Sequence, residues 1–301
     1  MNLEPEQVRK PPAVLNLDVI GSIVANEARR AVQELQPNVL HLTDPRDQFI
    51  REVKGILPEE FNILLKLATL RRNIMIVGPA GCGKTYIAER IADALGLPFS
   101  SISCTAGMSE SQLLGWLLPT GEGGKFEYQA APFVDKYENG GVFLLDELDS
   151  GDSNTLMILN QALSSNKFFV PQRLGNQTVH RHPDFVCIAA CNTFGQGADM
   201  VYVGRNQLDG ATLDRFAANT VKMEYSPIVE KALIHPEVLR WGVEIRNKIE
   251  EAQLHRILST RIMIDFTLMV DNYDMELEEW ESRYFQNWSS EEISRVKDTE
   301  D

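Results

Sequence analysis

The sequence predicts an α/β fold in which a parallel sheet, flanked by helices, carries a glycine-rich loop and is followed by a helical C-terminal lid. Three observations lead to this prediction. Short apolar runs alternate with helical patterns over residues 56–226, as in parallel sheets with crossover helices. One strand-to-helix junction reads G-P-A-G-C-G-K-T. Beyond residue 227 the hydrophobic pattern is helical only.

The first strand of the predicted sheet is the apolar run I-M-I-V at 74–77, which leads directly into the octapeptide. A helical pattern over 57–69 precedes it. Ile87, Ile91 and Leu95 follow at four-residue spacing, which predicts a helix. A strand, a glycine-rich turn and a helix form the context in which this octapeptide is a phosphate-binding loop (P-loop).

The octapeptide supplies the groups that bind a nucleoside triphosphate. Its glycines let backbone N–H groups point at phosphate oxygens, and the following helix adds its positive end. The lysine can reach the β- and γ-phosphates, and the threonine hydroxyl can hold Mg²⁺. We therefore expect ATP and Mg²⁺ as ligands, with Thr85 also binding the metal. The predicted nucleotide-binding residues are Gly78, Pro79, Ala80, Gly81, Cys82, Gly83, Lys84, Thr85 and Tyr86.

The next part of the chain contains a second strand and an insertion. Residues 99–104 are expected to form the strand, and Ser109 or Ser111 to cap a helix that runs through Leu118. The turn-rich segment 121–125 is either a pore loop or an ordinary surface loop. Residues 132–138 are expected to be helical.

Two adjacent carboxylates follow the most apolar strand. The run V-F-L-L at 142–145 is typical of a central parallel strand, and Asp146 and Glu147 come directly after it. This is the Walker-B pattern. Asp146 is placed to hold the metal, and Glu147 to polarise the attacking water.

A hairpin and a further buried strand complete the sheet region. We expect the hairpin arms at 167–170 and 178–180 and the strand at 185–190, beyond which Asn192 would face the γ-phosphate. In the helical C-terminal region, Ser259 can cap a helix whose first turn carries Arg261. The acidic aromatic helix near Trp280 either docks a partner or packs within the lid.

Composition excludes several classes of function. The net charge is −14, and residues 271–301 hold eleven acidic and three basic residues. This acidity argues against broad nucleic-acid binding while leaving room for a small basic patch. Apolar stretches fall short of the roughly 18 residues that a membrane span needs. Four cysteines without a C-x-x-C pair are typical of a reduced, cytoplasmic protein.

The order of these motifs resembles that of the AAA+ ATPases. The resemblance extends over roughly residues 56–270, and the P-loop and Walker-B pattern are its most specific parts. It implies that Asn192 is the sensor-one residue, that Arg215 is an arginine finger reaching a neighbouring subunit, and that Arg261 is the sensor-two residue. Arg205 is a second candidate finger. A local ion pair of Arg215 with Asp214 is the alternative for that residue.

Other segments narrow the resemblance. Residues 113–136 are similar to the helix-2 insertion of the MoxR and dynein-related branch, and residues 166–184 to the hairpin of that branch. The stretch from 192 to 216 resembles the CobS subunit of cobaltochelatase most closely, with GvpN and CbbQ/NorQ proteins as nearby relatives. The resemblance implies a hexameric ring and a partner protein with a von Willebrand factor A domain.

The resulting prediction is an Mg²⁺-dependent ATPase whose ring remodels a protein partner. Three alternatives remain: a chelatase motor subunit for metal insertion into a tetrapyrrole, a nucleic-acid-linked restriction-type motor, and a nucleotide-gated scaffold. The expected organisation is an N-terminal extension (1–55), a nucleotide-binding αβ domain (56–226), and a helical lid with an acidic tail (227–301).

Overall fold

A computed structural model describes residues 37–38, 53–121, 123–273 and 275–297. Most of the predicted N-terminal extension lies outside these residues. The strands are β1 (Pro37–Asn38), β2 (Val53–Lys54), β3 (Ile74–Val77), β4 (Phe99–Ser103), β5 (Trp116–Pro119), β6 (Phe126–Gln129), β7 (Gly141–Asp146), β8 (Lys167–Phe169), β9 (Thr178–His180), β10 (Phe185–Cys191) and β11 (Thr220–Lys222). The helices are α2 (Phe61–Thr69), α3 (Lys84–Leu95), α4 (Glu110–Leu114), α5 (Pro132–Asn139), α6 (Ser153–Ser164), α7 (Gly210–Asp214), α8 (Pro227–Leu233), α9 (Pro236–Glu251), α10 (Thr260–Tyr273), α11 (Leu277–Phe285) and α12 (Ser290–Lys297).

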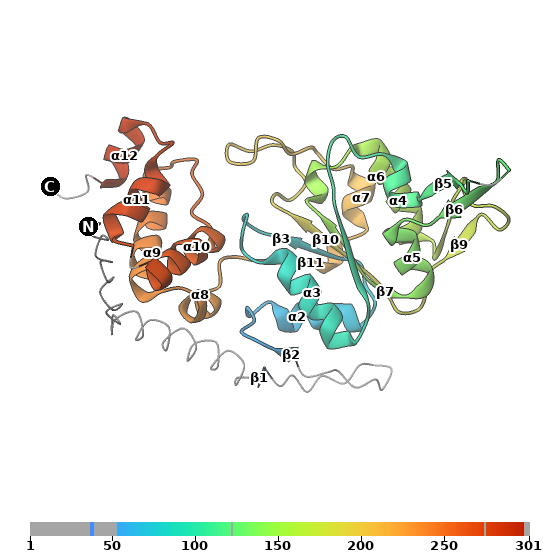
Figure 1. The fold of residues 1–301 in the computed structure, drawn as a ribbon, viewed down its shortest axis with the longest axis horizontal. Helices are drawn as coiled ribbons and strands as arrows, with labels where there is room; N and C mark the ends of the chain where they lie inside the picture. Colours follow the sequence, from blue (N-terminus) through green and yellow to red (C-terminus); the bar gives the residue numbers. More distant parts are fainter. Residues whose placement is uncertain (1–36, 39–52, 122, 274, 298–301) are drawn as a thin grey trace, which may run out of the picture.

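The central sheet is parallel and five-stranded, in the order β11-β3-β10-β7-β4 (Figure 1). Every residue of β3 and β10 is buried, because helices cover both faces of the sheet. The predicted fold class, a parallel sheet flanked by helices with helices at the C-terminus, is confirmed. Since the strands are parallel, the ends of β3, β7 and β10 lie at one edge.

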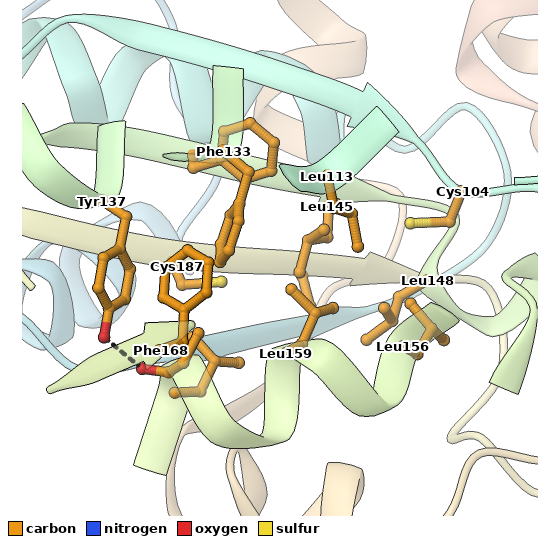
Figure 2. Close-up of a cluster of buried hydrophobic side chains, with 14 of the residues drawn as sticks. Cys104, Leu113, Phe133, Tyr137, Leu145, Leu148, Leu156, Leu159, Phe168 and Cys187 are labelled. Carbon is orange, nitrogen blue, oxygen red and sulfur yellow. Dashed lines mark hydrogen bonds between the residues drawn. The ribbon is translucent and has the colours of Figure 1, made fainter. Parts of the chain in front are cut away.

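Two apolar cores sandwich the sheet. One contains α5 and α6, where Phe133 and Phe168 pack with Tyr137 (Figure 2). The Tyr137 hydroxyl donates a hydrogen bond of 2.7 Å to the Ala162 carbonyl, which joins α5 to α6. The other core contains α2 and α3, with Ile87 of α3 fully buried. The second core fixes α3, and with it the P-loop, against the sheet.

The segment before the insertion differs from the prediction. The helix expected through Leu118 ends at Leu114, and residues 116–119 instead pair as β5 with β6 in an antiparallel hairpin. Gly115 causes the change, because its φ is +106° and a Cβ there would lie 2.3 Å from the Gln129 carbonyl oxygen. The hairpin of β8 and β9 forms as predicted.

The C-terminal helices α8–α12, called the helical lid below, pack around their own aromatic core. Trp241 and Trp280 lie 4.6 Å apart at their ring centroids, in an edge-to-face arrangement. Trp280 is therefore part of the lid core, which answers the question left open for this helix. The lid and the β5–β6 hairpin lie at opposite ends of the molecule (Figure 1). Among the described helices, none is long and apolar enough to cross a membrane.

Candidate active site

The predicted site residues gather at the carboxyl edge of the sheet. Strand β3 leads into the P-loop, and β10 lies beside it in a register that sets Cys191 opposite Val77. Strand β7 flanks β10 on its other side and ends at Asp146. Asn192 follows β10 directly. The topology thus brings together motifs that are more than 100 residues apart in the sequence.

The P-loop wraps closely against neighbouring backbone. A Cβ on Gly78 would lie 2.0 Å from the Met223 carbonyl oxygen, so only glycine fits there. Gly81 and Gly83 have φ values of +75° and +97°, in the left-handed region that glycine adopts without strain. Gly83 caps α3, whose N-terminus therefore opens onto the loop.

Lys84 lies at the centre of the site. Its Nζ donates hydrogen bonds to the Gly78 carbonyl (2.7 Å), the Pro79 carbonyl (2.9 Å) and Asn192 Oδ1 (2.8 Å). Burial lowers the pKa of this ammonium group. The structure thus joins the P-loop lysine and the strand-end asparagine, two residues that the sequence predicts to share one phosphate.

Thr85, at the start of α3, and Asp146, at the end of β7, place a hydroxyl and a carboxylate side by side. Thr85 Oγ1 donates to Asp146 Oδ2 at 2.7 Å, and the Glu147 amide donates to Asp146 Oδ1 at 3.0 Å. A hydroxyl and a carboxylate are the hard oxygen ligands that Mg²⁺ prefers, with phosphates and water completing its shell. The residues present therefore fit the predicted metal.

Glu147 is paired with an arginine of its own chain. Arg205 Nη2 lies 3.1 Å from Glu147 Oε1, and Arg205 Nη1 lies 3.7 Å from Asp149 Oδ1. Glu147 has a φ of +53°, in the left-handed region that non-glycine residues rarely adopt. The Arg205 side chain is only 12% exposed. Arg205 thus contacts the candidate base within one subunit.

Asp149 is a site residue that the sequence analysis missed. It is fully buried, and its Oδ2 accepts hydrogen bonds from the Asn192 amide (3.0 Å), the Thr193 amide (2.9 Å) and the Thr193 hydroxyl (2.9 Å). These bonds fix the backbone that carries the Asn192 side chain. Its position as the fourth residue of D-E-L-D is the only sequence signal for it.

We predict that Asp149→Ala lowers the free energy of unfolding by about 3 kcal/mol, because it leaves buried donors without a partner. Urea unfolding measures this loss. Asp152 is the matched control, since its carboxylate caps α6 through one bond from the Thr155 amide. Asp152→Ala should cost about 1 kcal/mol. Equal losses for the two variants would contradict the role given to Asp149.

A cavity of 370 Å³ adjoins the P-loop. Tyr86, Met223 and Ile264 give it apolar walls, and Gly81, Gly83 and Arg261 also line it. Arg261 lies in the first turn of α10, as predicted, and the Ser259 hydroxyl accepts a hydrogen bond from the Ile262 amide. A largely apolar cavity beside a phosphate loop suits the base and sugar of a nucleotide.

Arg215 lies apart from this cluster. Its Nη1 pairs with Asp214 at 3.1 Å, which is the local ion pair considered in the sequence analysis. Its Nε is buried without a hydrogen-bond partner among the described residues. The structure therefore brings Arg205 to the site within one chain but does not bring Arg215 there.

A P-loop, carboxylates at the end of a neighbouring strand, and a strand-end asparagine define the nucleotide site of the P-loop ATPase class. Residues 73–216 match the family model of the AAA domain, dynein-related subfamily. The P-loop, Asp146, Glu147 and Asn192 all lie within the matched segment.

The full-length comparisons give distant relatives. The chain is 25% identical over 222 residues to an uncharacterized protein of Staphylococcus saprophyticus, covering 69% of this chain and 81% of the relative. It is 26% identical over 211 residues to the denitrification regulatory protein NirQ of Stutzerimonas stutzeri, covering 65% and 71%.

Solved structures of NtrX from Brucella abortus give weaker matches. The complex with ADP has a TM-score of 0.44 at 18% identity and covers 82% of this chain and 49% of that one. The complex with ATP has a TM-score of 0.43 at 16% identity and covers 95% and 60%. The narrower resemblance to CobS stays a prediction.

Proposed function

We propose that the chain is an Mg²⁺-dependent ATPase that works as a subunit of a ring and remodels a protein partner. The observation that carries this proposal is the convergence of Lys84, Asp146, Glu147 and Asn192 at one sheet edge, inside a segment that matches an AAA domain. Except for a positive charge supplied by a neighbouring subunit, all groups needed to bind and cleave a triphosphate lie at this edge.

Each residue has a distinct role in the proposed reaction. Lys84 and the α3 N-terminus bind the phosphates, while Thr85 and Asp146 hold Mg²⁺, which neutralises phosphate charge when bound. Glu147 accepts the proton of the attacking water. Asn192, held by Asp149, positions that water and the γ-phosphate. Arg261 reaches the phosphates from the lid.

We assign the trans-acting charge to Arg215. Arg205 is paired with Glu147 in the site of its own chain, whereas Arg215 pairs with its exposed neighbour Asp214 and its Nε lacks a partner among the described residues. A guanidinium supplied by the next subunit would stabilise the charge that builds up on the transferred phosphoryl group. This assignment makes hydrolysis depend on ring assembly.

The β5–β6 hairpin supports contact with a protein partner. Trp116, Leu117, Leu118 and Phe126 are all exposed on it, and Phe126 keeps 54% of its surface accessible. Apolar patches of this kind mark protein interaction sites. The family resemblance supports a von Willebrand factor A-domain protein as that partner, and the acidic charge disfavours a nucleic acid.

The proposal is tested by phosphate release from ATP with the purified chain in the presence of Mg²⁺ or EDTA. Wild type should turn over ATP only with Mg²⁺. Lys84→Ala should lower turnover by about 100-fold or more, because the positive charge of the lysine beside the phosphates is lost. Lys125→Ala, in the exposed turn of the β5–β6 hairpin, should match wild type. Absence of both ATP binding and turnover in wild type, at high protein concentration, would disprove the proposal.

A further inference from the structure

Two tyrosine hydroxyls hold the backbone of Ala80 in the P-loop. The Ala80 carbonyl accepts a hydrogen bond of 3.0 Å from Tyr225, and the Ala80 amide donates one of 2.9 Å to Tyr202. The preceding carbonyl, of Pro79, accepts from Lys84. The hydrogen bonds of Ala80 are thus made to side chains from two distant segments.

The Tyr225 bond sets the direction of a phosphate-binding group. A peptide unit is planar and trans, so the Ala80 carbonyl and the Gly81 amide point in opposite directions. By drawing the carbonyl outward, Tyr225 keeps the Gly81 N–H turned inward. Burial raises the pKa of the Tyr225 hydroxyl, so it remains a donor at neutral pH.

Tyr225 is in turn held by the helical lid. The Arg246 guanidinium of α9 lies 3.9 Å from the centroid of the Tyr225 ring. Arg246 forms two hydrogen bonds, of 3.0 and 2.8 Å, with the buried carboxylate of Glu230 in α8, and its Nε donates to the Leu258 carbonyl at 2.7 Å. A bidentate pair of this kind has one well-defined geometry.

The same carboxylate reaches the start of α10. The Thr260 hydroxyl donates to Glu230 Oε1 at 2.5 Å, and Arg261 follows Thr260 directly. A Cβ on Gly81 would lie 2.7 Å from Ser259 Cβ, so the P-loop and the N-terminus of α10 are also in close contact. Helices α8, α9 and α10 therefore meet at the Glu230 carboxylate, and Arg246 connects this cluster to Tyr225.

We propose that Tyr225 is a positioning residue that ties the conformation of the P-loop to the position of the lid, through Arg246 and Glu230. The inference rests on the proposed ATPase function. Breaking the Tyr225 bond frees the peptide between Ala80 and Gly81, and a carbonyl that turns inward repels phosphate. Movement of the lid would be transmitted along the same contacts.

The first test is Tyr225→Phe, which removes one hydroxyl and keeps the ring against Arg246. Loss of one neutral hydrogen bond corresponds to about a 2- to 10-fold change. We expect KM for ATP and the Kd for N-methylanthraniloyl-ATP to rise by that factor, while kcat stays within about 2-fold, because ground-state binding is what is lost. Partial unfolding would instead lower kcat and leave KM unchanged.

Tyr284→Phe is the matched control. Its hydroxyl is buried in the lid without a hydrogen-bond partner among the described residues, so KM should not change. If wild type neither binds nor hydrolyses ATP, the proposed function itself fails. If wild type turns over ATP and Tyr225→Phe has the wild-type KM, only the coupling through Tyr225 is disproved.

A double-mutant cycle tests the connection to the lid. Arg246→Lys keeps a cation near Glu230 but loses the two-bond geometry and the contact with the ring. The double variant of Arg246→Lys and Tyr225→Phe should raise Kd by less than the product of the two single-variant factors. When Arg246→Lys is combined with Tyr202→Phe, which acts on the preceding peptide (Pro79–Ala80), the two effects should multiply. If the effects on Kd multiply in both cycles, the proposal is overturned. Thermal unfolding of each variant checks that the lid is folded.

Discussion

Replacement of Glu147 by glutamine is expected to lower ATP turnover by about 100- to 10,000-fold, the contribution of a positioned general base. The amide keeps the shape of the side chain and its acceptor oxygen toward Arg205, but it cannot take a proton from water. Binding of nucleotide should persist, because Lys84, Thr85 and Asp146 are untouched. Steady-state phosphate release and the Kd for N-methylanthraniloyl-ATP measure the two effects separately.

Glu138→Gln is the control for this substitution. Glu138 pairs with Arg173, an arginine between β8 and β9, at 3.0 Å. Turnover of Glu138→Gln should equal that of wild type. Wild-type turnover in Glu147→Gln would remove Glu147 from the mechanism. If Glu147→Gln loses turnover but keeps full biological activity, the protein is better described as a nucleotide-gated scaffold.

The local structure that the sequence predicted correctly is encoded by neighbouring residues. The run at 142–145 followed by Asp146 forms β7, which ends beside the P-loop. The helix expected over 132–138 forms as α5 (Pro132–Asn139), with proline at its first position. In these segments burial, periodicity and turn residues all favour the same local structure.

The missed residues depend on contacts between distant segments. Asp149 reads as part of an acidic turn, and only the approach of β10 supplies the three donors that justify its burial. Tyr202 and Tyr225 have no motif of their own and meet at Ala80 from positions more than 120 residues away. The helix predicted through Leu118 ends at Leu114 because Gly115 adopts a positive φ, after which residues 116–119 pair with β6.

The structure also separates two arginines that the sequence left equivalent. Arg205 and Arg215 both follow the strand that ends before Asn192, within one loop and helix. Folding brings Arg205 into contact with Glu147 and leaves Arg215 paired with its neighbour Asp214. On this difference we base the proposed roles, within the subunit for Arg205 and between subunits for Arg215. The two proposed roles have opposite consequences when subunits are mixed.

Arg215→Ala is expected to lower kcat of the assembled protein by about 1,000-fold, the lower range for loss of an arginine finger. Nucleotide affinity of the isolated subunit should remain near the wild-type value, since Arg215 contacts no P-loop residue among its described hydrogen bonds. Phosphate release measured over a series of protein concentrations provides the test. Turnover of wild type per subunit should rise with concentration, and that of Arg215→Ala should not.

Mixing of variants decides whether Arg215 acts across an interface. Arg215→Ala subunits retain Glu147, and Glu147→Gln subunits retain Arg215, so a mixed assembly contains complete sites and should regain turnover. Arg205→Ala mixed with Glu147→Gln should not, because every subunit with an intact Glu147 then lacks its own Arg205. If turnover recovers in the second mixture and not in the first, Arg205 acts between subunits and Arg215 acts within its own subunit. Recovery in neither mixture would show that Arg215 completes no site of a neighbouring subunit.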